Sequence, residues 1–333
     1  MLRLLRQVYG PPFCLPNAAC FDFKAGCGTC VSKKFDSRQP CCYRMRTAAK
    51  SEMSVKETVR YLWATAINDK RPCEEYSWRW LNRLAERLTW SNSGASIRPQ
   101  YAWGTVMAGA QARALKQADC SLIEFGVAGG NGLLALQTIA AEVSSIIGVR
   151  LNIFGFDTGA GLPDVQDVRD MPQVYKRGDY RMDFETLEKR LAESTKLVIG
   201  NVNETVEDFL KQPHSPVGFV SFDMDLYTST RDALALFRGA AALINCLPRV
   251  VCYFDDVMGV TMAAITGERL AIREYNEAHR PFRCVSPVYG LRYDLGWPQN
   301  RAQWPDLMYW AHFLDRPDYG TYDGLVPYTQ ATL

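Results

Sequence analysis

The sequence predicts an α/β fold in which a mostly parallel sheet carries helices on both of its faces. From Ser121 onward, apolar segments typical of strands alternate with amphipathic segments typical of helices, and this alternation indicates a parallel sheet. Several strand-like segments end in acidic residues, and the first is followed by four glycines within seven residues, from Gly126 to Gly132. Because ligands bind at the carboxyl ends of parallel strands, these acids and glycines predict a binding site at one edge of the sheet.

The composition is that of an ordinary globular protein and excludes several classes of function. Of the 333 residues, 47% are hydrophobic and 22% are charged, which leaves ample material for a buried core. The formal net charge of +2 gives no indication of a nucleic-acid or anionic-membrane partner. No apolar run approaches the roughly 18 residues of a membrane span, and Met1–Gly10 lacks the apolar core of a signal peptide. We therefore expect a soluble, cytoplasmic protein that binds neither nucleic acid nor membrane.

Changes of composition along the chain predict four parts. These are an irregular cysteine-rich leader over residues 1–50, a helical cap or lid over 51–118, a core domain over 119–300 and a tail over 301–333. Six of the eleven cysteines lie in the first 42 residues, and two of these form a C-x-x-C pair. A small metal knuckle is one interpretation, although a zinc site usually needs a second ligand pair at matching spacing. A poorly ordered leader is the plainer interpretation.

Three helices are expected before the first strand. Ser54–Ala64 has helical spacing, with a capping serine and a glutamate three positions later. Tyr76–Leu88 repeats the amphipathic pattern, and a third helix is expected over Thr105–Lys116. Tyr101 and Trp103, just before this helix, are expected to pack within the cap. Because no strand precedes these helices, they cannot be sheet crossovers, and we interpret them as an N-terminal cap.

The core domain is expected to alternate strands and helices. The expected strands are one that begins at Ser121, followed by Leu151–Asp157, Lys196–Gly200, Val217–Asp223, Val250–Asp256, Phe282–Val285 and Gly290–Tyr293. The expected helices are Leu133–Ala141, Phe184–Glu193, Thr228–Phe237 and Glu268–His279. The acids that gather at strand ends are Glu124, Asp157, Asp223, Asp225, Asp255 and Asp256. One such acid is often a turn or cap residue, but acids at four strand ends of one sheet predict a functional site.

Two cofactors compete for the glycine-rich turn. Gly130–Ala135 matches the G-x-G-x-x-A variant of the dinucleotide fingerprint. In that fingerprint the ribose-binding acid follows by about 20 residues, and Asp157 lies further along than this. Glu124 beside the glycines would also repel a pyrophosphate, whereas it would attract the positively charged sulfonium and amine of S-adenosylmethionine. The residues therefore favour S-adenosylmethionine over NAD, and a turn that needs glycine only for packing is the third interpretation.

Four motifs in this region resemble those of class I S-adenosylmethionine-dependent methyltransferases, and in particular the macrocin O-methyltransferase group. In chain order they are Glu124–Gly130, Gly155–Pro163, Asp223–Thr230 and the pair Asp255-Asp256. They occur in the family's order, while the first 50 and the last 30 residues have no counterpart. The resemblance implies a Rossmann-like sheet and an enzyme that transfers a methyl group from S-adenosylmethionine to a hydroxyl oxygen of a small-molecule acceptor.

The resemblance also implies a set of cofactor-binding residues, namely Glu124, Gly126, Gly129, Gly130, Asp157, Thr158, Val202 and Asp223. Within this set, the turn from Gly126 to Gly130 would hold the methionine moiety. Asp157 would accept hydrogen bonds from both ribose hydroxyls, which suits its two oxygens. Val202, together with Asn201, would flank the adenine.

A divalent-metal site is implied by the same family. Asp223, Asp255 and Asp256 match its ligands, and three carboxylates suit a hard ion such as magnesium. A metal there would lower the pKa of a substrate hydroxyl and orient it toward the methyl group. However, Gly239–Arg249 lacks the Gly-Gly turn typical of the family. The alternative is that Asp223 and Asp225 orient the substrate while Asp255 and Asp256 cap the next helix.

The general base is sought among the three histidines of the chain. His279 is the best candidate among three histidines, so the predicted catalytic residues are Asp223 and His279, although a positive charge at a helix end is favourable without catalysis. Two other functions stay open: an NAD-dependent oxidoreductase, and an inactive cofactor-binding domain that serves as an interaction module. The sequence leaves open the identity of the acceptor and whether the protein forms a homo-oligomer.

Overall fold

The computed structural model describes the following residues: 78–91, 98–259, 263–295 and 301–320. All of them belong to the unit Met53–Leu333. The helix expected over Ser54–Ala64 and the cysteine-rich leader lie outside these ranges. Within them, no helix is both long enough and apolar enough to cross a membrane.

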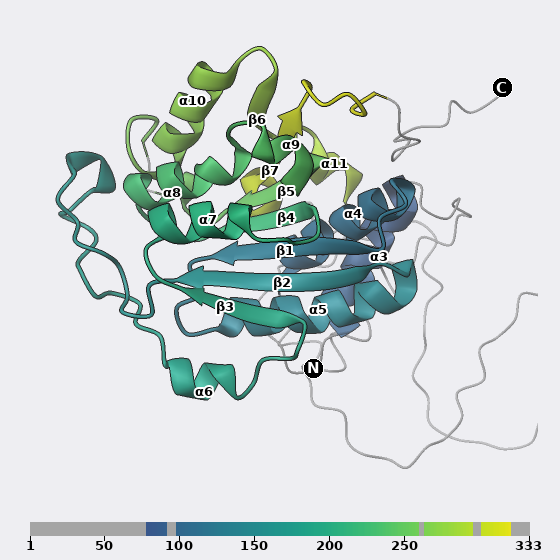
Figure 1. Ribbon diagram of the computed structural model, residues 1–333, viewed down its shortest axis with the longest axis horizontal. Helices are drawn as coiled ribbons and strands as arrows, with labels where there is room; N and C mark the ends of the chain where they lie inside the picture. The colour runs from purple at the N-terminus through teal and green to yellow at the C-terminus, as the bar shows by residue number, and fades with distance from the viewer. Residues whose placement is uncertain (1–77, 92–97, 260–262, 296–300, 321–333) are drawn as a thin grey trace, which may run out of the picture. The chain divides into compact units, whose positions relative to one another are not determined.

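The centre of this unit is a seven-stranded sheet with the order β3-β2-β1-β4-β5-β7-β6 (Figure 1). In chain order the strands are β1 (Asp119–Phe125), β2 (Arg150–Asp157), β3 (Thr195–Ile199), β4 (Val217–Phe222), β5 (Cys246–Phe254), β6 (Arg283–Pro287) and β7 (Met308–Phe313). Strands β1 to β5 are parallel, and β7 is antiparallel to both β5 and β6. This arrangement confirms the predicted mostly parallel, Rossmann-like sheet. The order reverses between β1 and β4, which is where such sheets bind ligands.

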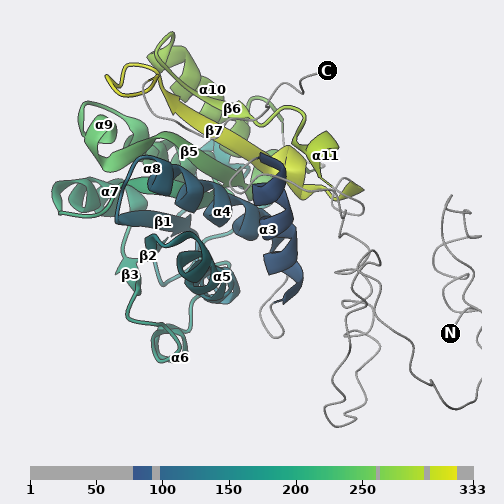
Figure 2. The ribbon, with the colours of Figure 1, turned by 90° about the vertical axis from the view of Figure 1, so that its right-hand side faces the viewer.

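Helices cover both faces of the sheet (Figures 1 and 2). The α-helices are α3 (Trp78–Ser91), α4 (Pro99–Ala114), α5 (Asn131–Ile147), α6 (Phe184–Glu188), α7 (Val202–Lys211), α8 (Tyr227–Ala233), α9 (Ala241–Asn245), α10 (Gly267–His279) and α11 (Leu291–Asp294). Short 3-10 helices are η1 (Val168–Asp170), η2 (Leu234–Phe237), η3 (Asp255–Val257) and η5 (Trp304–Leu307). On one face α4 packs against α3 and α5 as well as β1, β4 and β5, and on the other α8 packs against α7 and α10.

Helix α4, which was expected within the cap, is a core helix of the sheet. Nearly all of its side chains are buried, because Ala and Gly residues along it allow a close approach to the strands. Tyr101 and Trp103 are fully buried, as expected of packing residues. Trp103 donates a hydrogen bond of 2.9 Å to Asn82 of α3, and Trp78 of α3 donates one of 3.0 Å to Asp294 of α11. The first contact joins α4 to α3, and the second joins α3 to α11, which lies near α3 in Figure 2.

Three sequence expectations in the core domain need correction. The strand expected over Gly290–Tyr293 is wrong, since Gly290 adopts a left-handed conformation and begins the short helix α11. The last strand is instead β7, which lies in the segment that was set apart as a tail. Helix α7 was not predicted at all, although it has two buried residues, Val206 and Phe209, on one face. All three corrections concern short segments, whose periodicity extends over too few residues to distinguish helix from strand.

The packing of α4 on the sheet predicts that Gly104 cannot be enlarged. A Cβ at Gly104 would lie 2.4 Å from two ring atoms of Phe219 on β4. We expect Gly104→Ala to lower the free energy of unfolding by about 1–3 kcal/mol, the usual effect of overpacking, as measured by urea denaturation.

A second substitution tests whether overpacking is the cause of the lower free energy of unfolding. Adding Phe219→Leu to Gly104→Ala removes the ring atoms that the new methyl group meets, so the double variant should be more stable than the two separate losses would suggest. A Gly104→Ala protein as stable as the wild type would contradict the close packing described here.

Candidate active site

A cavity of about 690 Å³ opens at the carboxyl ends of the parallel strands. Its walls are the turns that follow strands β1 to β5, together with Arg98 at the start of α4. Most of the residues predicted to bind a cofactor or metal line this cavity: Glu124, Gly126, Gly129, Asp157, Thr158, Val202, Asp223, Asp255 and Asp256. The fold therefore brings nearly the whole predicted set into one place.

Two predicted residues, Gly130 and His279, are not part of the cavity wall. Gly130 caps α5 with a φ of 78°, and a Cβ there would lie 2.4 Å from Leu187, so its role is to shape the turn. His279 lies in the last turn of α10, where its ring stacks on Tyr275 with centroids 4.3 Å apart. Its Nδ1 lies 2.7 Å from the carbonyl oxygen of Tyr275. The structure does not bring His279 to Asp223, and a base must be sought among the cavity residues.

Backbone N–H groups of the glycine turn after β1 donate to a carboxylate of the protein and are therefore not free to bind an anion. Oδ2 of Asp157 accepts hydrogen bonds of 2.9 Å from the backbone N–H groups of both Val127 and Ala128. Its Oδ1 accepts one of 2.7 Å from the N–H of Gly159. Gly126 has a φ of 84°, and a Cβ there would lie 1.8 Å from the carbonyl oxygen of Asp223. Only glycine lets the turn pass this close to the segment that follows β4.

Glu124 lies beneath the start of α5 and is only 2% exposed. Tyr101 of α4 donates a hydrogen bond of 2.7 Å to its Oε1, and Ser221 of β4 donates one of 3.0 Å to the Tyr101 hydroxyl. Oε2 of Glu124 has no hydrogen-bond partner among the described residues. Burial raises the pKa of Glu124 to about 8, although the Tyr101 hydrogen bond and the nearby Arg98 oppose the shift. Since a buried, unpartnered polar atom is unfavourable, a cationic donor from a ligand would be stabilised at this oxygen once the carboxyl group loses its proton.

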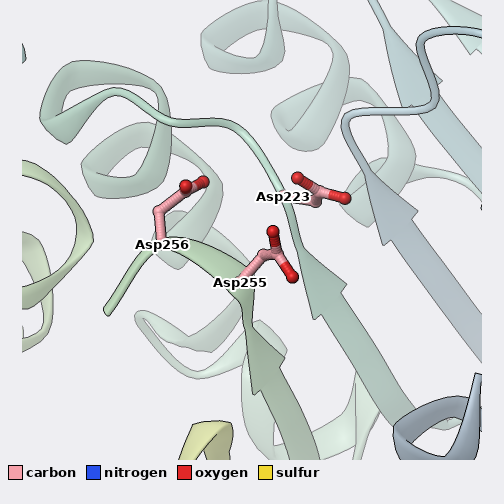
Figure 3. Close-up of side chains that lie close together, drawn as sticks. All are labelled: Asp223, Asp255 and Asp256. Atoms are coloured by element: carbon pink, nitrogen blue, oxygen red, sulfur yellow. The ribbon is translucent and has the colours of Figure 1, made fainter. Parts of the chain in front are cut away.

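Three carboxylates converge in the part of the cavity formed by the ends of β4 and β5. Asp223 follows β4, while Asp255 and Asp256 follow β5 (Figure 3). Each offers one oxygen such that all three oxygens lie within 4.8 Å of one another. Tyr253 donates a hydrogen bond to Oδ1 of Asp255, and Asp256 accepts one of 3.0 Å from the backbone N–H of Asp225. The predicted metal ligands are thus close enough to share one ion.

Burial and the repulsion of neighbouring carboxyl groups make Asp223 and Asp256 hard to ionise. Burial, followed by the charges of Asp255 and Asp256, raises the pKa of Asp223 to about 7. Burial and then Asp225 and Asp255 raise the pKa of Asp256 to about 7. A divalent cation would replace the shared protons and relieve the repulsion. Oxygen donors at this spacing therefore fit a hard ion such as magnesium.

Two further acids lie at this edge: Asp225, which the alternative interpretation of the sequence had orienting the substrate, and Glu268, which was not predicted. Asp225 lines the cavity, and burial, followed by the charge of Asp223, raises its pKa to about 6. It has a left-handed φ of 62°, and Tyr175 forms a hydrogen bond with its carboxylate. Glu268 is fully buried in the first turn of α10 and accepts a hydrogen bond of 3.0 Å from the N–H of Asp256. Asp225 belongs to the same motif as Asp223, whereas Glu268 has no motif that would identify it.

The segment between β2 and β3 forms the outer wall of the cavity. Thr158 stabilises the start of this segment, since its hydroxyl donates a hydrogen bond of 2.6 Å to the carbonyl of Gly161. Asp170 is buried and accepts hydrogen bonds of 2.8 Å from both the N–H and the hydroxyl of Thr228 in α8. Tyr175 and Tyr180 from the same segment line the cavity. The contact with α8 thus holds two aromatic side chains beside the acids.

The burial of Glu124 predicts a pH dependence of stability. Its pKa of about 8 in the folded protein exceeds the ordinary value of 4.5, so between these values the unfolded chain binds fewer protons than the folded one. The free energy of unfolding therefore falls as pH rises through this window, with a slope from this group of at most about 1.4 kcal/mol per pH unit.

Glu124→Gln should remove this contribution, because the amide does not ionise and its oxygen can still accept from Tyr101. Urea denaturation between pH 5 and 8 should give the variant a flatter dependence than the wild type. Parallel curves for the two proteins would contradict the raised pKa.

Comparison with known proteins yields only distant structural likenesses. Searches of protein-family models and of curated proteins find no match. Among solved structures, CalS11, a calicheamicin methyltransferase, is 22% identical, covering 74% of this chain and 96% of its own, with a TM-score of 0.42. The O-methyltransferase NovP is 13% identical, covering 78% of this chain and 99% of its own, with a TM-score of 0.46. At these values neither likeness assigns an activity to this chain, and the function proposed below rests on the site itself.

Proposed function

We propose that this protein is an S-adenosylmethionine-dependent methyltransferase that acts on a hydroxyl group of a small-molecule acceptor. The observation that carries the proposal is the chemistry of the glycine turn. A buried carboxyl with a free oxygen, Glu124, lies beside it, and the amides of Val127 and Ala128 already donate to Asp157. Such a turn suits a ligand with positive charge and hydroxyl groups.

Several residues fit the parts of this cofactor. Oε2 of Glu124 would accept from its ammonium group, and Gly129 leaves open space where a side chain would project. Three of the about four acceptor sites of Asp157 are used within the turn, so about one site remains for a ribose hydroxyl rather than the two that were expected. Val202 and Asn201, at the start of α7, line the cavity beyond Asp157 and would flank the adenine. When bound, S-adenosylmethionine supplies an electrophilic methyl group.

The same turn disfavours the NAD-dependent alternative. A pyrophosphate is normally held by free backbone N–H groups at the start of the helix that follows the glycines. Here the N–H groups of Val127 and Ala128, in the turn that leads into this helix, already donate to Asp157. A Cβ at Gly132 would lie 2.0 Å from Oε1 of Glu124, so an acid occupies the space beside this helix start. The negatively charged pyrophosphate of NAD would lie beside the carboxyl groups of Glu124 and Asp157 and would be repelled by them.

We further propose that Asp223, Asp255 and Asp256 hold a magnesium ion and that Asp225 is the general base. A bound magnesium ion would lower the pKa of the acceptor hydroxyl. Asp225 lines the cavity beside this cluster, and a carboxylate in this position suits the role of a general base. Its hydrogen bond to Tyr175 would orient the carboxylate that accepts the hydroxyl proton. This role replaces the one first considered for His279.

The acceptor would lie between the three acids and the β2–β3 segment. This side of the cavity carries apolar and aromatic groups, Leu162, Pro163, Tyr175 and Tyr180, and Tyr180 is 58% exposed at its rim. Such a wall suits a small molecule with an apolar or ring-shaped body whose hydroxyl reaches the acids. An inactive interaction module would bind the cofactor without turnover, and a panel of hydroxylated ring compounds assayed with magnesium distinguishes it from an enzyme.

The first test of the proposal uses Gly129 and titration with S-adenosylhomocysteine. Because a Cβ at Gly129 meets no atom within 4 Å, Gly129→Leu should leave stability unchanged but fill the place of the cofactor. We expect it to weaken S-adenosylhomocysteine binding by about 5- to 100-fold, as 1–3 kcal/mol of overpacking implies, in isothermal titration calorimetry.

Gly130→Ala is the matched comparison for this experiment. Its new methyl group would meet Leu187 and require a left-handed φ, so it should lower the stability of the fold rather than affect binding alone. If the wild type does not bind S-adenosylhomocysteine, or if Gly129→Leu binds it equally well, the cofactor assignment is wrong.

The metal assignment predicts a separate effect at Asp223. Asp223→Asn should weaken magnesium binding about tenfold or more, because ligand charge sets the affinity for hard cations, and it should abolish magnesium-stimulated methyl transfer. Asp164→Asn removes the same charge from an exposed residue that does not line the cavity and serves as the control. Methyl transfer by Asp223→Asn at the wild-type rate, or full wild-type activity in a chelator, would exclude the metal role.

A further inference from the structure

Arg98 is a cation in the cavity wall that has no assigned role. It is the residue before α4, is half-buried and lines the cavity. Its guanidinium lies over the ring of Tyr101, with Cζ 5.1 Å from the ring centroid. Among the described residues it forms no ion pair, and its Nε is buried without a hydrogen-bond partner. A buried donor of this kind is unfavourable unless a ligand supplies the acceptor.

The neighbouring groups keep Arg98 charged, although neither of the two nearby carboxyl groups forms an ion pair with it. Burial alone would lower its pKa, but the neighbouring Tyr101, Glu124 and Asp223 raise it overall. Neither carboxyl group lies within 4.0 Å of the guanidinium, as an ion pair would require. A partly buried charge without a paired partner is unfavourable, so the free protein holds a cation that an anionic group of a ligand can complete.

Glu124 lies near Arg98 in the same wall of the cavity. Tyr101 connects the two: its ring lies under the guanidinium and its hydroxyl donates to Oε1 of Glu124. The buried Oε2 of Glu124 also lacks a partner. The wall therefore presents one unused donor on a cation and one unused acceptor on a carboxyl group, close to each other.

We propose that Arg98 and Glu124 form a subsite for an α-amino-acid group, in which Arg98 binds the carboxylate and Glu124 accepts from the ammonium. The inference rests on the proposed function, where this group is the methionine end of S-adenosylmethionine, and it makes Arg98 a specificity residue for that end. A guanidinium presents its donors in a planar fork that matches a carboxylate. The adjacent acids Glu124 and Asp223 would repel a phosphate, which carries more negative charge.

The first experiment varies the ligand and uses the wild-type protein. Three probes are titrated into the wild type: S-adenosylhomocysteine, its decarboxylated analogue, and 5′-methylthioadenosine, which lacks both the amine and the carboxylate. We expect removal of the carboxylate to weaken binding by about 10- to 100-fold, the usual effect of losing a charge-assisted hydrogen bond. Equal binding of the first two probes would overturn the role of Arg98.

The second experiment titrates the same three probes into the variants Arg98→Met and Arg98→Lys. Arg98→Met should bind S-adenosylhomocysteine as weakly as its decarboxylated analogue while binding 5′-methylthioadenosine as the wild type does, and Arg98→Lys should recover part of the preference for the carboxylate. A general loss of structure would weaken all three probes equally, whereas the proposal requires a loss confined to the probe with the carboxylate.

Arg150→Met is the matched control, because Arg150 is 71% exposed and lies at the amino end of β2, at the other edge of the sheet. It should retain the wild-type preference. If Arg98→Met also retains that preference, the inference is wrong while the cofactor assignment stands. If no probe binds the wild type, the proposed function fails and this inference fails with it.

Discussion

The site depends on a row of four phenylalanine rings that crosses the sheet at the carboxyl ends of its strands. Phe125, Phe156, Phe222 and Phe254 are paired in register on β1, β2, β4 and β5, and neighbouring rings lie 4.4–5.4 Å apart. All four are buried. The acids that follow these strands therefore stand on an apolar base that excludes water from one side. This base is the physical reason why several carboxyl groups at this edge are hard to ionise.

The alternation of a β-strand places a polar row directly beside the apolar one. Residues one position earlier point to the opposite face, and Glu124, Ser221 and Tyr253 are again paired in register. Tyr101 of α4 packs against this row, accepting from Ser221 and donating to Glu124. The close approach of α4 at its glycines is thus a requirement of the site as well as of the core, because it brings Tyr101 and Arg98 to the strand ends.

The strand ends could be predicted from the sequence because each combines a continuous apolar run with an acid, and parallel strands place such acids at one edge. Asp223, Asp255 and Asp256 were found in this way. Arg98 could not be found, since it precedes a helix that is remote in sequence and no motif contains it. His279 was chosen for its chemistry alone, and its helix carries it to Tyr275 instead. Strand β7 was missed because its aromatic residues resemble a surface tail until β5 and β6 are seen to flank it.

Protonation connects the parts of the cavity. Glu124 beside the glycine turn and Asp223 and Asp256 in the acidic cluster all have raised pKa values, and Arg98 lowers the pKa of both Glu124 and Asp223. A cationic group that binds at either place must displace a proton or share one, so its affinity rises with pH. Because the two places interact through the same low-dielectric space, a positive charge bound at one makes it easier to ionise the carboxyl groups at the other. Cofactor and metal binding in such a cavity would therefore be coupled through the protonation of these carboxyl groups, without any movement of the backbone.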